Sequence, residues 1–153
     1  LREQIDAAAD AVREVAHGLS PRILSEQGLG PALEELTAGL PVETDVSWEG
    51  RTGSGAPSPS DEASEDLYLI ASEAITNAMK HSGCSRIEVD VAPRDGVVQL
   101  TVRDDGAGGA APTGRGILSM AARARRLGGT FELVSPDGGP TTVMVRIPSG
   151  GPR

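Results

Sequence analysis

Leu67-Tyr-Leu-Ile-Ala-Ser-Glu-Ala-Ile-Thr-Asn-Ala-Met-Lys-His81 is the stretch that decides the fold. Its apolar residues recur at the spacing of one helical stripe, and that stripe consists of Leu67, Ile70, Ala71, Ala74, Ile75 and Ala78. Glu73, Asn77 and Lys80 follow one another along its edge, about one turn apart. The pattern predicts a buried helix. Its polar border, with His81 beside it, either lines a pocket or is an ordinary solvated flank.

Two helices and a strand are predicted before this stretch. Residues 2–19 have apolar residues at i, i+3, i+4 and i+7, with charged residues on the other face. Their seam is narrow and rich in small residues, as in a bundle helix, so we expect self-association or a truncated bundle. Residues 20–29 are typical of a connector with apolar anchors. Pro31 favours the start of a helix over residues 31–38, and alternation from Val42 to Trp48 predicts a strand.

Strands dominate the chain after the opening helix. The predicted elements are a hairpin of residues 86–91 and 97–102 around Asp95-Gly96, a helix over 116–127, and a strand pair of residues 130–134 and 142–147. Residues 50–60, which precede the opening helix, are rich in Gly, Ser and Pro and predict a mobile loop, with Ser60 or Asp61 as the helix cap. This order predicts an α+β fold, a two-layer sandwich of a mixed, mostly antiparallel sheet with helices on one face.

Composition limits the classes of function. The 153 residues suffice for one domain with a core, and the net charge of −8 argues against a general nucleic-acid binder. The single Cys84 excludes an internal disulfide, suits a reducing cytoplasm and is expected to be a small buried thiol. No apolar run could span a bilayer. Because the chain begins at Leu1, we expect a piece of a longer protein. We expect this piece to be soluble and cytoplasmic, while another part of the parent protein could be anchored in a membrane.

Two glycine-containing segments carry further candidate chemistry. Asp104-Asp-Gly-Ala-Gly108 follows a predicted strand, and its glycines allow a tight turn and close approach of a ligand to the backbone. A carboxylate there could accept from an exocyclic amine, although such clusters are often plain turns. Gly114-Arg-Gly116 opens a helix, where free N–H groups attract anions such as phosphate. A simple loop-to-helix junction is the alternative for this second segment.

Together these segments resemble the N, G1 and G2 boxes of the GHKL ATPase superfamily. The N box is Glu73-x-x-x-Asn77-x-x-Lys80-His81, the G1 box is Asp104-x-Gly-x-Gly108, and the G2 box is Gly114-x-Gly116. Within the superfamily, the sequences of residues 73–81 and 114–129 are similar to those of sensor histidine kinases that pair with nitrate-response, LuxR-like regulators. Residues 13–24 and 28–33 also resemble the exit from the dimerisation helices of that group. The resemblance implies the Bergerat ATP-binding fold.

The resemblance also implies roles for individual residues. Asn77 would ligate Mg²⁺ that bridges the ATP phosphates, and Glu73 would be the polarising or general-base residue near the γ-phosphate. The residues implied near the phosphates or in their lid are Lys80, His81, Gly114, Arg115 and Gly116. The residues implied at the adenine are Asp104, which accepts from its amino group, Gly106 and Gly108, which pass under it, and Thr141, which supports it through Asp104 and water.

The chain also departs from the family pattern. Gly109 stands where an aromatic residue is common, Pro140 where glycine is usual, and the lid is short and expected to be mobile without nucleotide. We find no phospho-acceptor box in the sequence. His17 is followed by Gly18 rather than by an acidic residue, so we interpret it as a structural or linker residue. Arg123, Arg125 and Arg126 are interpreted as a solvated basic face.

These observations predict residues 1–24 as the end of a dimerisation helix with its connector, and residues 25–153 as an ATP-binding catalytic domain. The expected function is donation of the γ-phosphoryl group of Mg·ATP to a histidine outside this chain. The expected partners are the phospho-acceptor and dimerisation domain of a homodimeric parent and, indirectly, a response regulator, but no nucleic acid. An anti-sigma serine kinase of the same fold and a degenerate, non-catalytic interaction module stay open as alternatives.

Overall fold

The computed structural model describes residues 2–18, 22–48, 61–110 and 114–148. Within these residues, five strands form one sheet in the order β1-β2-β3-β5-β4. They are β1 (Glu43–Trp48), β2 (Arg86–Arg94), β3 (Val97–Asp104), β4 (Thr130–Val134) and β5 (Thr141–Pro148). β1 pairs with β2 in parallel, and the remaining pairs are antiparallel. The predicted mixed, mostly antiparallel sheet is therefore confirmed.

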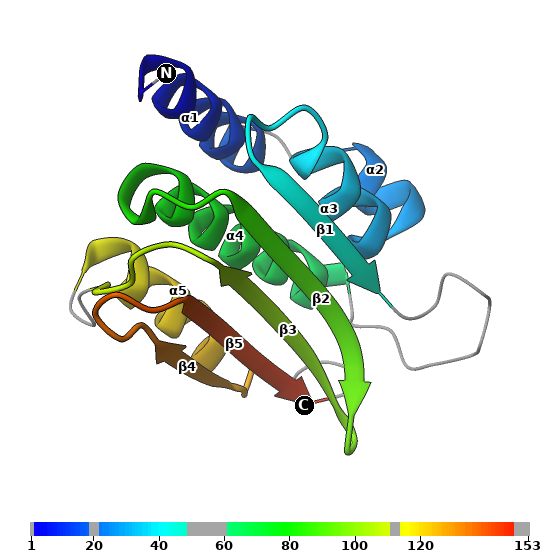
Figure 1. Cartoon of the computed structure of the whole chain (residues 1–153). Coiled ribbons are helices and arrows are strands. Elements are labelled where there is room, and N and C mark those ends of the chain that lie inside the picture. The colour runs from blue at the N-terminus through cyan, green and yellow to red at the C-terminus, as the bar shows by residue number, and fades with distance from the viewer. Residues whose placement is uncertain (1, 19–21, 49–60, 111–113, 149–153) are drawn as a thin grey trace.

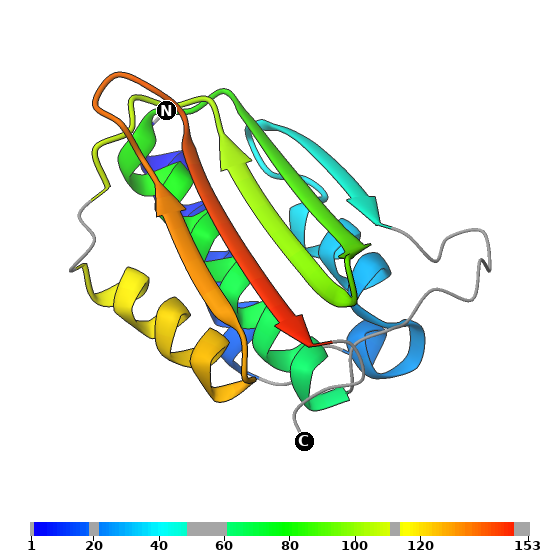
Figure 2. The same ribbon diagram turned by 90° about the horizontal axis from the view of Figure 1, so that it is seen from below.

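Helices cover one face of this sheet (Figures 1 and 2). They are α1 (Arg2–Gly18), α2 (Arg22–Gln27), α3 (Leu29–Thr37), α4 (Asp61–Asn77), the π-helical turn η1 (Ala78–Ser82) and α5 (Arg115–Arg126). The predicted opening helix is α4, which contacts α1, α3, α5 and β3 and so organises the helical layer. Its stripe is buried as expected, with Leu67, Ile70, Ala71 and Ile75 at 0% exposure. The α+β sandwich is thus confirmed.

The N-terminal helices differ from the sequence prediction in three ways. The seam of α1 is covered within the chain, because Ala9 and Val12 are buried where α1 packs on α4 and η1. The predicted connector contains α2, whose Leu24 is buried in the core. Helix α3 begins two residues before Pro31, which the first turn tolerates because its N–H groups have no intrahelical partner.

Other predictions about local structure have mixed outcomes. Asp95 and Gly96 both have positive φ, as the predicted hairpin turn requires. Cys84 is half-buried, and burial raises the pKa of its thiol. The predicted solvated basic face holds for Arg125 and Arg126, which are exposed, whereas Arg123 is partly buried; Arg123 and Arg126 also pair with the buried Asp66, which was not predicted. The side chain of His17, the caps at residues 60–61 and the loop of residues 50–60 lie outside the described residues. No helix in the described ranges is both long and apolar enough to cross a membrane.

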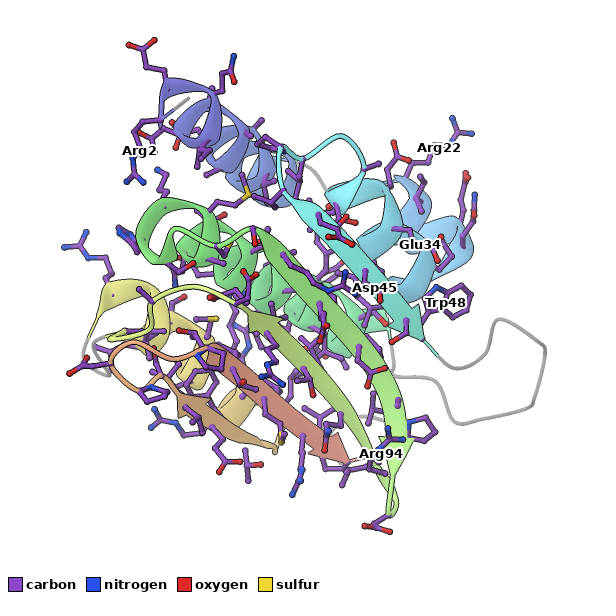
Figure 3. All side chains as sticks on the ribbon, in the orientation of Figure 1. Arg2, Arg22, Glu34, Asp45, Trp48 and Arg94 are labelled. Carbon is purple, nitrogen blue, oxygen red and sulfur yellow. The ribbon has the colours of Figure 1, made fainter. Side chains whose placement is uncertain are left out.

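Trp48, at the end of β1, packs on a glycine of α3. Its Nε1 donates to Glu34 Oε1 at 2.9 Å (Figure 3). A Cβ atom at Gly30 would lie 2.5 Å from Trp48 Cε2 and Cγ, so only glycine lets the ring lie flat on this helix. This contact joins α3 to the edge of the sheet.

We expect Gly30→Ala to displace the Trp48 ring. Overpacking of this kind costs about 1–3 kcal/mol of the free energy of unfolding. Because Trp48 is the only tryptophan in the chain, its fluorescence should shift to longer wavelength as the ring becomes more exposed. Unchanged emission together with an unchanged Tm would contradict this packing.

Candidate nucleotide-binding site

A cavity of about 750 Å³ opens between α4, η1, the β3–α5 segment and β5. Its volume lies in the range of pockets for small molecules and cofactors. It is lined by Glu73, Ala74, Asn77, Ala78, His81, Ser82, Asp104, Gly108, Gly109, Ala110, Gly114, Arg115, Gly116, Ile117, Ser119, Thr141 and Val143. The three predicted segments, which are far apart in the sequence, therefore meet at one cavity.

One end of the cavity is built around Asp104, the last residue of β3. The backbone register places Asp104 opposite Thr141 on the neighbouring β5. Asp104 is 5% exposed, and burial raises the pKa of its carboxyl group. Hydrogen bonds from the Gly106 N–H, at 2.8 Å to Oδ1, and from the Ser82 hydroxyl lower that pKa in part. A buried carboxylate beside a threonine hydroxyl is well suited to accept a hydrogen bond from a ligand.

The neighbouring Asp105 has a different role. Its carboxylate accepts hydrogen bonds from Ser85 N at 2.8 Å, Ser85 Oγ at 2.7 Å and Arg86 N at 3.0 Å. These bonds, with that from the Ser85 hydroxyl as the largest contribution, lower the pKa of Asp105. Asp105 therefore anchors the start of β2 and does not line the cavity.

Ser135 supports the same end of the cavity and was missed by the sequence analysis. Its hydroxyl lies 2.7 Å from Thr141 Oγ1 and also accepts from Ala110 N at 2.9 Å. It therefore connects Thr141 to the loop after Asp104. A serine before a turn is too common to indicate such a role, so no sequence signal could have found it.

The loop after Asp104 is held by the turn between β4 and β5. Gly138 N donates to Ala107 O at 2.7 Å, and Gly109 N donates to Ser135 O at 3.2 Å. Gly108 has φ +69°, and a Cβ atom there would lie 2.5 Å from Gly139 O and closer still to Pro136 O. Glycine at this position is therefore required both by the backbone conformation and by the close packing of the two loops.

The other end of the cavity lies where α5 begins over α4. Glu73 and Asn77, one turn apart on α4, line the wall beneath the first turn of α5. A Cβ atom at Gly116 would overlap Glu73 Oε1 and lie 3.3 Å from Asn77 Nδ2. The N-cap residue Gly114 makes no side-chain capping bond. The first N–H groups of α5 thus have no side-chain cap at a place where an anion would be stabilised.

Two predicted site residues lie outside the cavity lining. Lys80 Nζ pairs with Asp10 Oδ1 of α1 at 2.7 Å, because the π-helical turn after Asn77 is wider and rotates Lys80 away from the polar stripe. Gly106 packs against Ser82, where a Cβ atom would lie 2.5 Å from the Ser82 carbonyl oxygen. The other nine predicted residues, including His81 and Arg115, line the cavity.

The donor set of the cavity fits a magnesium ion that is bound mainly through a ligand. Asn77 and Glu73 offer hard oxygen atoms, which Mg²⁺ prefers. In the part of the chain that the structure describes, no cluster of three or more His, Cys, Asp or Glu side chains could hold a metal. Mg²⁺ usually takes one or two protein ligands together with phosphate oxygens.

Comparison with known proteins agrees with this geometry. Among curated proteins, the chain is 36% identical over 155 residues to the nitrate/nitrite sensor protein NarX of Escherichia coli K12, covering 95% of this chain and 25% of NarX. It is 28% identical over 158 residues to the sensor histidine kinase MctS of Rhizobium johnstonii, covering 99% of this chain and 34% of MctS. The chain thus spans about a quarter to a third of the length of these relatives.

Solved structures share the fold. The histidine kinase domain of a blue-light activated histidine kinase from Erythrobacter litoralis matches with a TM-score of 0.59 and 18% identity, over 93% of this chain and 65% of that domain. The family model described as histidine kinase-, DNA gyrase B- and HSP90-like ATPase matches residues 62–151, which hold Glu73, Asn77, Asp104 and Gly116. The chain belongs to this ATPase family, and its relatives in it are sensor histidine kinases.

Proposed function

We propose that this chain binds Mg·ATP and donates the γ-phosphoryl group to a histidine that belongs to another domain. The observation that carries the proposal is the meeting, in one cavity, of the buried Asp104 with Glu73, Asn77 and the uncapped N-terminus of α5. A nucleotide has an amine at one end and phosphates at the other, and the two ends of the cavity are complementary to these groups.

The purine would lie at the β3–β5 end. Asp104 would accept a hydrogen bond from the exocyclic amine of adenine. Thr141, which lies opposite Asp104 and is held by Ser135, would support the adenine beside this hydrogen bond. Gly108 would allow the purine to approach the backbone. Guanine carries a carbonyl oxygen where adenine carries the amine, so the ionised Asp104 would repel it.

The phosphates would lie at the α4–α5 end. Backbone N–H groups at Gly114, Arg115 and Gly116 would stabilise their charge. Asn77 would hold the Mg²⁺, which when bound supplies charge neutralisation to the phosphates. Glu73 would accept the proton of the incoming imidazole as its nitrogen bonds to phosphorus and ADP leaves. Such transfer needs positioning and charge neutralisation more than covalent chemistry by the protein.

The partners follow from the same proposal. Residues 1–24 would be the end of a dimerisation helix and its connector. The acceptor histidine would come from the phospho-acceptor domain of a homodimeric parent, and that domain would pass the phosphoryl group on to a response regulator. The resemblance to NarX and MctS extends over nearly the whole chain, α1 included. This extent favours a sensor kinase over an anti-sigma serine kinase, and the presence of Glu73, Asn77 and Asp104 in the cavity favours catalysis over a degenerate docking module.

Asp104→Asn tests the proposal directly. We expect it to weaken the binding of MgADP by about 10- to 100-fold, because hydrogen bonds to a charged group contribute about 1.5–3 kcal/mol. The introduced asparagine also has an N–H₂ donor, which cannot accept from the exocyclic amine of adenine. Titration calorimetry on the wild type and the variant measures the change. Asp105→Asn is the matched control, since Asp105 faces Ser85 and Arg86 rather than the cavity. Equal affinities of the wild type and Asp104→Asn, or tight GDP binding by the wild type, would contradict the assignment.

A further inference from the structure

An ion cluster centred on the buried Asp66, with Arg123 partly exposed and Arg126 exposed, joins α4 to α5 at the end remote from the cavity. Asp66 of α4 is 3% exposed, and its Oδ1 accepts from Arg123 Nη1 at 2.9 Å and from Arg126 Nη2. Its Oδ2 is buried and has no hydrogen-bond partner among the described residues. Asp66, Arg123 and Arg126 are not among the residues that line the cavity in the described structure. Among the described elements, the only route from this cluster to the cavity is therefore the placement of α5.

The cluster is in register with the contact at the cavity. Helix α4 runs toward the cavity and α5 runs away from it, so the two helices are antiparallel (Figure 1). Asp66 and Glu73 are seven positions apart on α4, and Gly116 and Arg123 are seven positions apart on α5. Seven residues are two helical turns, or about 10.5 Å on each helix. The distance from the Gly116–Glu73 contact to the Asp66–Arg123 pair is thus the same along both helices, so the two contacts fix the same alignment of α5 on α4.

Apolar packing alone would hold α5 less specifically. The residues that α5 buries are Ile117, Met120 and Ala124. Such contacts are non-directional and tolerate small shifts along the helix. A guanidinium paired with a buried carboxylate has a defined geometry and is costly to break, because separation leaves a buried charge without its partner. The best-attested use of a buried polar cluster is to set the register of helices.

We propose that Asp66, Arg123 and Arg126 are positioning residues that set the height of the α5 N-terminus over Glu73 and Asn77, and so determine the affinity of the cavity for the phosphates of its ligand. This inference rests on the proposed function. According to this inference, a cluster outside the cavity changes the affinity for the phosphates and not the affinity for the adenine. The purine end is built on Asp104 of β3 and Thr141 of β5 rather than on the first turn of α5, so we expect adenosine affinity to change much less than MgADP affinity.

The test compares MgADP with adenosine, which lacks phosphates, on the whole chain. Arg123→Gln should weaken MgADP binding by about tenfold, equivalent to ~1.4 kcal/mol, while adenosine affinity changes less than about twofold. Arg123→Lys, which keeps the charge, should recover part of the lost affinity. Arg125→Gln is the matched control, since Arg125 lies on the same helix, is exposed, and is not part of the cluster. It should bind both ligands as the wild type does.

A second variant keeps the test decisive if Arg123→Gln folds poorly. In Asp66→Leu/Arg123→Met the charged pair is replaced by apolar side chains, a change that is often neutral or stabilising. We expect it to melt near the wild-type temperature and still to show the selective loss of MgADP affinity. Wild-type affinity for MgADP in this folded double variant, or parallel losses for both ligands in Arg123→Gln, would overturn the inference. A wild-type chain that binds adenosine but not MgADP, or neither, would instead overturn the proposed function and this inference with it.

Discussion

Replacing Glu73 by glutamine is expected to slow phosphoryl transfer by about 100- to 10,000-fold, the range that a positioned general base contributes. Glutamine keeps the size and shape of the side chain, so the packing of Glu73 under Gly116 should persist. What the variant lacks is the negative charge that would receive the imidazole proton. The measurement is the rate of phosphorylation of the parent's acceptor domain at saturating Mg·ATP, followed with labelled nucleotide.

Binding distinguishes this role from a structural one. In Glu73→Gln the affinity for MgADP should stay within about threefold of the wild type, so the loss appears in kcat and not in KM. Asp105→Asn serves again as a control for the removal of a nearby carboxylate that does not line the cavity. If MgADP binding falls as far as the rate does, Glu73 holds α5 or the ligand in place, and another group must take the proton.

The sequence was most informative where function and local structure depend on the same short segment. Apolar periodicity predicted α4, and turn chemistry predicted the Asp95-Gly96 hairpin, because both patterns are local. The resemblance to known boxes then brought Glu73, Asn77, Asp104 and Thr141 to one cavity, although they come from three separate parts of the chain.

The remaining features depend on contacts that no local pattern reports. Lys80 was expected beside the phosphates, but the π-helical turn rotates it toward Asp10, and the spacing of an ideal helix does not include such a turn. Asp66 and Arg126 are 60 residues apart, so their pairing could not be distinguished from two solvated charges. Helix α2 is only six residues long, and its single buried residue leaves too little periodicity to recognise.

Gly108→Ala is expected to give the largest loss of stability among single substitutions at the cavity. A left-handed conformation costs a residue with a Cβ atom about 1–2 kcal/mol, and forcing that atom against Pro136 O and Gly139 O adds about 1–3 kcal/mol. A total near 3 kcal/mol lowers the Tm of a chain of this size by about 10 °C. Thermal unfolding followed by circular dichroism measures this. MgADP affinity should also fall, because the displaced turn carries Ser135 away from Thr141.

Gly109→Ala separates the two causes. Gly109 also has a positive φ, of +78°, but a Cβ atom there meets only Asp137 Oδ1, at 3.0 Å, and that atom belongs to a side chain that can move. This variant should therefore show the conformational cost alone, with a Tm lower by about 3–6 °C. If the two variants melt at the same temperature, the carbonyl oxygens of the β4–β5 turn do not press on Gly108. The close fit of that turn against the loop after Asp104 would then not be what holds the purine end of the cavity in shape.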